Sequence, residues 1–334
     1  MRKLKVAING FGRIGRLTFR NLIERSDVDV VAINDLTDAE TLAHLLKYDT
    51  AQGTLAENIQ VKNGHIHVGD ESFKVFSERD PAQLPWGDMG VDVVLESTGF
   101  FRTEEKAGKH IAAGAKKVVL SAPPKGGNIK IIVLGVNDHI LDGSEKIVSN
   151  ASCTTNCLAP MCKVLNKQFG IRNGLLTTVH AYTSSQNIQD GPHSDIRRAR
   201  AAAENLVPTT TGAAKTVEKV MPELSGKLDG LAFRVPVPTG SISDFTVTLE
   251  KNVHKDSINQ AFKEASENDL KGILYYLEDE LVSSDIVGSH YSCLYDPFLT
   301  YVQGDLVKIN GWYDNEFGYA SRSAELIAKV GQQI

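Results

Sequence analysis

The sequence predicts an α/β protein of two domains, the first with a parallel sheet and the second α+β with a mostly antiparallel sheet. Its 334 residues suffice for two domains of ordinary size. Apolar runs alternate with helical patterns through the first half, which is typical of parallel strands joined by crossover helices. In the second half, Phe245–Glu250 alternates apolar and polar residues, which indicates a half-solvated antiparallel strand. We therefore expect domains at residues 1–150 and 151–316, with the boundary near Ser149–Ser152, and a closing segment at 317–334.

The first domain is expected to alternate strands and helices, with one antiparallel insert. Asn58–Phe76 alternates apolar and polar residues around Asn63-Gly64, which is a hairpin signal. Helices are predicted from the apolar periodicity at Arg16–Arg25, Thr37–Lys47 and Thr103–Ala113. Buried strands are predicted at Lys5–Asn9, Val28–Asn34, Val91–Glu96, Lys117–Leu120 and Lys130–Gly135.

The second domain is expected to open with a long helix at Ser152–Gly170 and to close with a helix at Tyr319–Val330. Strands are predicted at Leu175–His180, Phe245–Glu250 and Leu306–Trp312. Between Ala181 and Leu206 lies a polar, arginine-rich stretch that is too long for an ordinary connection. Ordered loops of this length are usually functional or lie in an interface.

Composition and charge exclude several classes of protein. A hydrophobic content of 42% and a charged content of 23% are ordinary for a globular chain and argue against disorder. A net charge of −5 without a long basic run gives no support for nucleic-acid binding. No stretch approaches the roughly 18 apolar residues of a membrane helix, and Met1–Lys5 leads into an apolar run too short for a signal peptide. We therefore expect a soluble, cytoplasmic protein.

The four cysteines do not form a recognisable metal or disulfide pattern. Cys153, Cys157 and Cys162 are separated by gaps of three and four residues, which do not fit short-range zinc or disulfide spacings. A cytosol keeps such thiols reduced. We predict no metal, and for Cys157, Cys162 and Cys293 we expect the role of small buried side chains.

A glycine motif near the start predicts a dinucleotide site. Val6–Gly15 is a strand followed by G-x-G-x-x-G, and a second strand ends at Asp35. Gly10 would permit the tight turn, Gly12 would let the backbone approach a pyrophosphate, and Gly15 would let helix and strand pack closely. The helix N-terminus favours phosphate, and a carboxylate at Asp35 would accept ribose hydroxyls and repel a 2′-phosphate. A glycine turn without a ligand is the alternative, but the complete unit indicates a Rossmann-type domain that binds NAD.

Cys153 is the best candidate for a nucleophile. It follows Ser152, a favourable N-cap residue, so it would lie in the first turn of a helix. There the helix dipole favours the thiolate, the form of cysteine that attacks carbonyl groups. Cys157 lies one turn further along and is expected to be more deeply buried.

His180 is the best candidate for the base. It ends the apolar run Leu175–Val179 where a loop begins, and the end of a strand directs a side chain into a cleft. A structural histidine in this place is the alternative. His193, in the long loop, is not excluded by pattern, whereas the other histidines lie in helical, turn or surface-like contexts.

Two further segments offer groups that suit an anion. Thr209–Lys215 holds three hydroxyls and a glycine beside a helix start, which fits either an anion site or a threonine-rich cap. Arg234 lies inside the apolar run Leu231–Val237, and a buried arginine needs an anionic partner. The partner is either a protein carboxylate or a ligand phosphate, and the sequence leaves both open.

These segments together resemble the phosphorylating glyceraldehyde-3-phosphate dehydrogenases. The stretch Ser-Asn-Ala-Ser-Cys-Thr-Thr-Asn-Cys at Ser149–Cys157 is highly specific to this family and its near relatives. The resemblance extends over nearly the whole chain, at Asn9–Arg16, Ala32–Thr37, Glu96–Gly99, Ser149–Pro160, Thr177–Thr183, Arg197–Ala203, Pro208–Lys215, Arg234–Pro238 and Trp312–Gly318.

The resemblance implies that D-glyceraldehyde 3-phosphate is oxidised by NAD to 1,3-bisphosphoglycerate, a step of glycolysis and gluconeogenesis. Cys153 would carry a thiohemiacetal and then a thioester, His180 would move the protons, and inorganic phosphate would release the acyl phosphate. One phosphate site would comprise Ser152, Thr154, Thr211 and Gly212, and the other would comprise Thr183, Arg198 and Arg234. The NAD contacts would be Arg13, Ile14, Asp35, Arg79, Ser121 and Asn315.

The resemblance also implies a homotetramer, in which the loop after Ala181 lies against the neighbouring subunit's cofactor. It implies that the closing helix packs back on the NAD-binding domain. The chain departs from many bacterial relatives at Ser184-Ser185, where they carry Asn-Asp, and at Gly191-Pro192, where they carry Leu-Pro. The first departure bears on the geometry of a phosphate site, and the second lies near the adenosine ribose.

Three rival functions remain to be distinguished. Erythrose-4-phosphate dehydrogenase uses the same thioester chemistry but typically lacks the Thr209–Lys215 stretch and has a different sequence after the catalytic histidine. A cysteine hydrolase built on Cys153 and His180 would give the dinucleotide unit no purpose. A non-enzymatic NAD-binding scaffold would tolerate replacement of Cys153. Triose oxidation uses all of the segments that we identify.

Overall fold

The computed structural model describes residues 2–334, which divide into two compact units. The first unit contains residues up to Ile132, the segment His139–Ala151 and the final residues Ala320–Ile334. The second contains Val133–Asp138 and Ser152–Tyr319. Each unit has its own sheet, and the predicted fold class is confirmed. Among residues 2–334 no helix has the length and apolar character needed to cross a bilayer.

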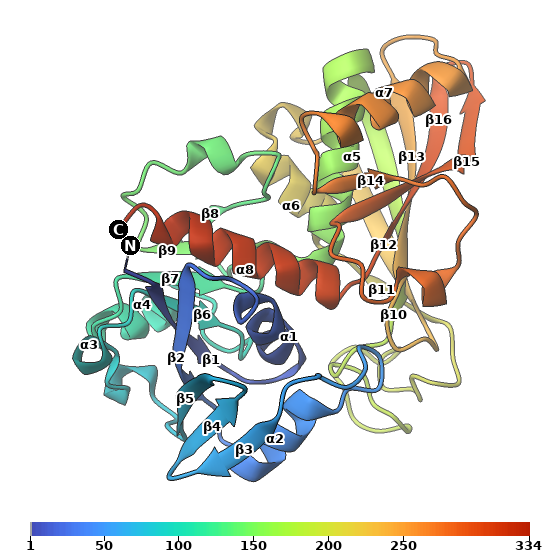
Figure 1. Cartoon of the computed structure of the whole chain (residues 1–334). Helices are drawn as coiled ribbons and strands as arrows, with labels where there is room; N and C mark the ends of the chain where they lie inside the picture. Colours follow the sequence, from blue (N-terminus) through green and yellow to red (C-terminus); the bar gives the residue numbers. More distant parts are fainter. Residues whose placement is uncertain (1) are drawn as a thin grey trace. The chain divides into compact units, whose positions relative to one another are not determined.

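The first unit is built on a nine-stranded sheet with the order β3-β4-β5-β2-β1-β6-β7-β9-β8 (Figure 1). Every neighbouring pair from β5 to β8 is parallel, and only β3-β4 and β4-β5 are antiparallel. The strands are β1 Leu4–Asn9, β2 Val28–Asn34, β3 Ile59–Lys62, β4 His65–Val68, β5 Glu71–Phe76, β6 Val93–Glu96, β7 Lys117–Leu120, β8 Lys130–Ile131 and β9 Ile147–Ser149. The helices are α1 Arg13–Leu22, α2 Ala39–Lys47, α3 Trp86–Met89 and α4 Glu104–Ala112, with short 3-10 turns at Pro81–Gln83 and Asp138–Ile140.

The second unit is built on a seven-stranded sheet with the order β11-β12-β10-β13-β16-β15-β14. Its pairs are antiparallel except β10-β12 and β14-β15. The strands are β10 Ile171–Ala181, β11 Val207–Thr210, β12 Leu228–Val235, β13 Ser241–Leu249, β14 Leu274–Tyr276, β15 Cys293–Gln303 and β16 Leu306–Tyr313. The helices are α5 Cys153–Phe169, α6 Ala213–Val220 and α7 Lys255–Glu267, with 3-10 turns at Pro222–Leu224 and Ser283–Ile286. The last helix, α8 Phe317–Gly331, begins in the second unit and belongs to the first unit from Ala320 onward.

Two local features have a clear sequence origin. Helix α5 begins at Ser152, whose hydroxyl accepts from the Thr155 N–H, and it ends at Gly170, whose φ of 71° few other residues adopt. The antiparallel insert forms as the Asn63-Gly64 signal predicts, since both residues take positive φ in the turn between β3 and β4.

One predicted strand is wrong in its extent. Lys130–Gly135 was expected to be a strand, but only Lys130–Ile131 pairs with β9. The chain turns after Ile132, because the Asn137 side chain accepts from the Val133 N–H at 2.8 Å and Gly135 has a φ of 77°. The apolar residues of this run are buried in a turn, where their pattern resembles that of a buried strand.

Candidate active site and dinucleotide site

The glycine turn of the first unit leaves no room for side chains at two positions. Gly10 has a φ of 90°, and a methyl group there would lie 2.7 Å from the Thr98 backbone nitrogen. A methyl group at Gly15 would lie 2.2 Å from the Gly10 carbonyl oxygen. Both distances are below van der Waals contact, so any larger residue would force the turn open. The tight turn and the close packing expected of these glycines are therefore present.

The N-terminus of α1 is open toward a ligand. Gly12 is its N-cap, no side chain caps the helix, and a methyl group at Gly12 would meet no atom within 4 Å. The first-turn N–H groups, including those of Arg13 and Ile14, have no acceptor within their own helix. Arg13 directs its guanidinium to Asp49 at 3.0 Å, so this side chain is held by a protein carboxylate. A helix start of this kind suits a pyrophosphate.

Asp35 follows β2 and is held by the backbone. One carboxylate oxygen accepts from the Phe11 N–H at 2.8 Å, and the other accepts from the Thr37 N–H at 3.0 Å. Each oxygen keeps a further lone pair, which suits a ribose diol. The glycine turn, the N–H donors of the helix start and the accepting carboxylate of Asp35 together fit a dinucleotide without a 2′-phosphate.

Arg79 and Ser121 are placed at the same edge of the sheet by topology. Arg79 is exposed and follows β5, whereas Ser121 is half-buried and follows β7, where its N–H donates to the Glu96 carbonyl at 2.9 Å. Strands β5, β2, β1, β6 and β7 are parallel neighbours, so their carboxyl ends meet at one edge. Ligands of open α/β sheets bind at this edge.

In the second unit, Cys153 and His180 lie within reach of one another. Cys153 is the first residue of α5 and His180 lies near the end of β10, and the thiol sulfur is 3.4 Å from His180 Nε2. His180 Nδ1 lies 2.7 Å from the Ala181 carbonyl oxygen, which can only accept. Arg234 Nη1, which can only donate, lies 3.0 Å from the same Nδ1 but also 3.0 Å from that carbonyl oxygen, so we assign its hydrogen bond to the oxygen. The hydrogen of the neutral ring is therefore on Nδ1, and the bare Nε2 faces the thiol as an acceptor.

The electrostatics of the pair favour a neutral resting state. Burial, together with the positive charges of Arg234 and Arg198, lowers the pKa of His180 to about 3. Burial also raises the pKa of the Cys153 thiol, against the lowering effect of Arg234 and of hydrogen bonds from Thr154. Burial therefore opposes the tendency of the helix N-terminus to favour the thiolate. A thiol beside a neutral imidazole needs His180 as its base.

Arg234 is the cation nearest the pair. It lies opposite His180 in the parallel register of β10 and β12, so both side chains are on one face of the sheet. Its Nη1 donates to the Ala181 carbonyl at 3.0 Å and lies 3.4 Å from the Thr183 hydroxyl, whereas its buried Nε has no protein partner among residues 2–334. No carboxylate pairs with this guanidinium among its described contacts, which favours the ligand-phosphate interpretation.

A second arginine is held nearby by a threonine and an aspartate. Arg198 Nε donates to Thr209 Oγ1 at 2.9 Å, and Thr209 donates in turn to Asp195 at 2.7 Å. Asp195 also lies 3.7 Å from Arg198. Burial lowers the pKa of Arg234, and the positive charge of Arg198 lowers it further. Two adjacent guanidinium groups suit a doubly charged phosphate.

The other anion-binding candidates are distributed over two helix starts. Ser152 caps α5, and Thr154 in its first turn directs its hydroxyl to the Tyr313 hydroxyl at 2.9 Å. Gly212 is the N-cap of α6 and has no side-chain cap, while Thr211 accepts from the Ala213 N–H at 3.2 Å. The threonine-rich stretch is therefore partly a cap, as one of the two sequence interpretations held.

Asn315 is buried and its orientation is fixed. Its Oδ1 accepts from the Ser241 hydroxyl at 2.8 Å, with the Thr239 hydroxyl at 3.4 Å. The Ser241 hydroxyl is the donor that identifies this atom as the amide oxygen, because the Thr239 hydroxyl gives its one hydrogen to Asp314 at 2.7 Å. The amide nitrogen of Asn315 therefore remains for a ligand acceptor. A carboxamide held in this way suits the orientation of a second amide such as that of nicotinamide.

Tyr313 is a residue that the sequence analysis missed. Its hydroxyl lies 2.9 Å from Thr154 Oγ1 and 2.8 Å from Thr178 Oγ1, and its ring packs edge-on against the His180 ring at 5.9 Å. It thus connects the first turn of α5 to β10, directly behind the Cys153–His180 pair. An aromatic residue in a strand normally indicates core packing, so no sequence signal distinguishes it.

Known proteins match this chain over almost its whole length. Residues 4–104 match the NAD binding domain of glyceraldehyde 3-phosphate dehydrogenase, and residues 152–315 match the C-terminal domain of the same enzyme. Relatives named glyceraldehyde-3-phosphate dehydrogenase are 57% identical in Streptomyces coelicolor and 54% identical in Mycolicibacterium smegmatis, each over 99% of both chains. A relative of the same name in Clostridium pasteurianum is 56% identical over 98% of this chain and 99% of its own.

The chain belongs to the glyceraldehyde-3-phosphate dehydrogenase family. The suspected resemblance is therefore confirmed, and so are the cofactor NAD and the class of NAD-dependent oxidoreductase. When bound, NAD supplies the acceptor for a hydride.

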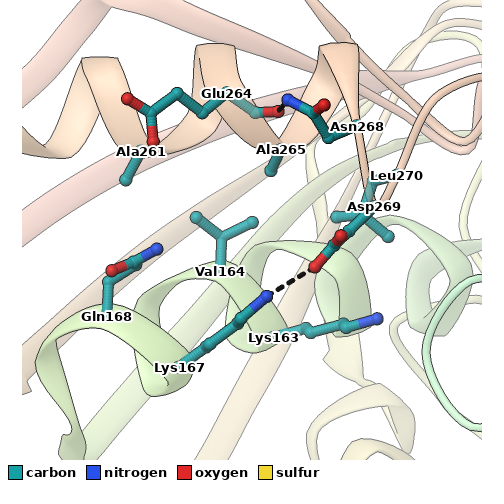
Figure 2. A pocket seen from close by; sticks show the side chains of 10 residues that line it. All are labelled: Lys163, Val164, Lys167, Gln168, Ala261, Glu264, Ala265, Asn268, Asp269 and Leu270. Atoms are coloured by element: carbon teal, nitrogen blue, oxygen red, sulfur yellow. Dashed lines mark hydrogen bonds and ion pairs between the residues drawn. The ribbon is translucent and has the colours of Figure 1, made fainter.

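A hollow on the second unit is separate from these groups. It lies between α5 and α7, as Figure 2 shows. Its volume is about 170 Å³. Several of its polar groups pair with protein atoms: Lys167 contacts Asp269 at 2.5 Å, and Asn268 donates to the Glu264 carbonyl at 2.8 Å. No cysteine or histidine lines it, so we assign no chemistry to it.

Proposed function

We propose that this chain oxidises D-glyceraldehyde 3-phosphate to 1,3-bisphosphoglycerate, using NAD and inorganic phosphate. The observation that carries the proposal is the 3.4 Å contact between the Cys153 thiol and the bare Nε2 of His180. The Ala181 carbonyl fixes the ring in the tautomer that accepts a proton at this atom.

The reaction uses these two side chains in two stages. As the Cys153 sulfur attacks the aldehyde carbon, its proton passes to His180 Nε2, and a thiohemiacetal forms. His180 then gives that proton to the new oxyanion, which becomes the thiohemiacetal hydroxyl, and afterwards takes the hydroxyl proton back as the carbon is oxidised. NAD, when bound, would accept the hydride from this carbon. A thioester on Cys153 remains. Attack by an oxygen of inorganic phosphate breaks the carbon–sulfur bond, releases the acyl phosphate and returns the sulfur for reprotonation.

The cationic groups account for the phosphates. Arg234 and Arg198, with Thr183, supply charge and a hydroxyl for one phosphate. The helix starts that hold Ser152, Thr154, Thr211 and Gly212 supply hydroxyls and N–H groups for the other phosphate.

We also propose a homotetramer that acts in the cytoplasm in glycolysis and gluconeogenesis. Ile188 and Ile196, in the long loop after Ala181, are 84% and 82% exposed, and Leu175 on β10 is 65% exposed. Burial of such exposed apolar side chains against another subunit would be favourable.

The test is the rate of NADH formation, followed by absorbance, with glyceraldehyde 3-phosphate and NAD in the presence and absence of inorganic phosphate. Phosphate-dependent formation is expected. Formation that is indifferent to phosphate would indicate hydrolysis of the thioester, and no formation would favour erythrose 4-phosphate as the next substrate to test. Cys153→Ser should abolish the reaction and leave the affinity for NAD nearly intact. Unchanged turnover in that variant would contradict the mechanism.

A further inference from the structure

A buried polar network lies beneath the dinucleotide edge of the first unit. Asn34, Asn9 and Glu96 end the neighbouring strands β2, β1 and β6, and their parallel registers place them side by side. All three are at most 4% exposed. Buried polar groups of this kind are costly unless each finds a partner, so their hydrogen bonds can be followed one by one.

The orientation of both amides is fixed by the backbone of Glu78. The Glu78 N–H donates to Asn34 Oδ1 at 2.8 Å, so that atom is the amide oxygen. Asn34 Nδ2 then donates to Asn9 Oδ1 at 2.7 Å, and Asn9 Nδ2 donates to Glu96 Oε2 at 2.6 Å. The chain of donors therefore ends on the Glu96 carboxylate.

A second chain of donors reaches the same carboxylate from the other side. The Trp86 indole N–H, which can only donate, lies 3.0 Å from His110 Nδ1. Nδ1 of the fully buried His110 therefore accepts from the indole, which leaves a ring hydrogen on Nε2. His110 Nε2 donates to Glu96 Oε2 at 2.9 Å.

The remaining oxygen of Glu96 is held by the loop that follows β6. The Thr98 N–H donates to Glu96 Oε1 at 2.9 Å, and the Thr98 hydroxyl donates to the same oxygen. Four donors thus converge on two oxygens, and none of them comes from a lysine or an arginine. A buried carboxylate held in this way depends on each of its donors staying in place.

We propose that Glu96 is the positioning residue of the NAD site, which it organises without contacting the cofactor. Thr98 lies against Gly10, where a methyl group would approach its nitrogen to 2.7 Å. Asn34 and Glu78 immediately precede Asp35 and Arg79 in the chain. The Glu96 carboxylate therefore sets the spacing between the glycine turn at Gly10 and the two residues, Asp35 and Arg79, that would hold the adenosine half of NAD. The proposal rests on NAD binding and not on the reaction proposed above.

Glu96→Gln tests this with almost no change in shape. Whichever way the new amide turns, its NH₂ faces donors: Asn9 and His110 on one side, or the Thr98 N–H on the other. The dissociation constants for NAD and for ADP-ribose, measured by calorimetry, should both rise at least tenfold, while kcat at saturating NAD should stay within twofold. Calorimetry needs no aldehyde, so its result stands even if the proposed reaction fails.

Two further variants control for charge and for folding. Glu105→Gln removes the same charge from an exposed position on α4 and should leave both dissociation constants unchanged. Thr98→Val removes one donor and keeps the carboxylate, so it should fold and raise the dissociation constant for NAD about threefold. If Glu96→Gln does not fold, Thr98→Val alone decides, and an unchanged dissociation constant overturns the proposal.

Two readouts separate positioning from general damage. In a Trp312→Phe background, Trp86 is the remaining tryptophan, and its emission should shift in Glu96→Gln because His110 loses its acceptor. The effects of Glu96→Gln and Asp35→Asn on the dissociation constant should be less than additive, since both act on one carboxylate's contact with the ribose. Additive effects, or equal losses in kcat and affinity, would overturn the proposal.

Discussion

Replacing Tyr313 by phenylalanine removes the hydroxyl that ties the first turn of α5 to the sheet. It breaks the bonds to Thr154 at 2.9 Å and to Thr178 at 2.8 Å, each of which contributes about 1 kcal/mol. A loss of about 2 kcal/mol in the free energy of unfolding is therefore expected. With an unfolding entropy of about 2.1 cal/mol/K per residue, 334 residues give about 0.7 kcal/mol/K, so Tm should fall by roughly 3 °C.

The same change should also reduce catalysis. Cys153 precedes Thr154 in the turn that loses its anchor, and small displacements of a reacting group reduce rates steeply. We expect kcat for NADH formation to fall about tenfold. The rate of alkylation by iodoacetamide should change as well. This rate reports on Cys153, because the other three cysteines are buried.

Tyr295→Phe is the matched control for this prediction. Its hydroxyl also makes two bonds, to Asn259 at 2.9 Å and to Thr300 at 2.6 Å, in the same unit but away from the catalytic pair. Both variants should lose a similar amount of Tm, and only Tyr313→Phe should lose kcat. If Tyr313→Phe lowers Tm but leaves kcat and the alkylation rate unchanged, the hydroxyl does not position Cys153, and the reasoning is refuted.

Two further predictions concern charge and pH. The positive charge of Arg234 lowers the pKa of the Cys153 thiol, so Arg234→Leu should raise that pKa. The pH profile of alkylation by iodoacetamide should then move to higher pH, and a move to lower pH would contradict this prediction. Burial and the charge of Arg234 lower the pKa of His180 from 6.5 to about 3. Between pH 6.5 and pH 3 the imidazole is therefore protonated in the unfolded chain and neutral in the folded chain. The free energy of unfolding consequently decreases as the pH falls below 6.5. The decrease amounts to about 2 kcal/mol at pH 5, and the His180→Asn variant should not show it. Urea unfolding of both proteins at pH 5 and pH 8 measures the decrease, and an equal decrease in the variant would contradict this pKa for His180.

The sequence predicts the first unit well because its signals are local. The alternation of strands and helices, the glycine turn and the hairpin at Asn63-Gly64 each depend on neighbouring residues, and the structure has all of them. Helix α5 is predicted for the same reason, since its start at Ser152 and its end at Gly170 are both marked by residue type. The exception is the run after Ile131, where a buried turn and a buried strand have the same apolar composition.

The second unit is predicted less completely because its order depends on distant pairing. Strand β15 at Cys293–Gln303 contains a proline and an irregular register, and its pattern does not identify it as a strand. The sequence identifies Cys153 and His180 as candidates. It does not predict the distance between them, because that distance depends on how α5 packs against the sheet. It also gives no indication of the burial that keeps the thiol protonated, or of the position of Tyr313.

The bond between Thr154 and Tyr313 joins residues 159 positions apart. During synthesis at about 5 to 20 residues per second, Cys153 leaves the ribosome roughly 8 to 30 s before its supporting tyrosine. Through that interval the nascent chain carries its nucleophile in a helix whose sheet is incomplete, without the burial that raises the thiol pKa. The thiol is then at its most open to oxidation, so oxidative stress during translation should damage new chains at Cys153 more readily than finished enzyme.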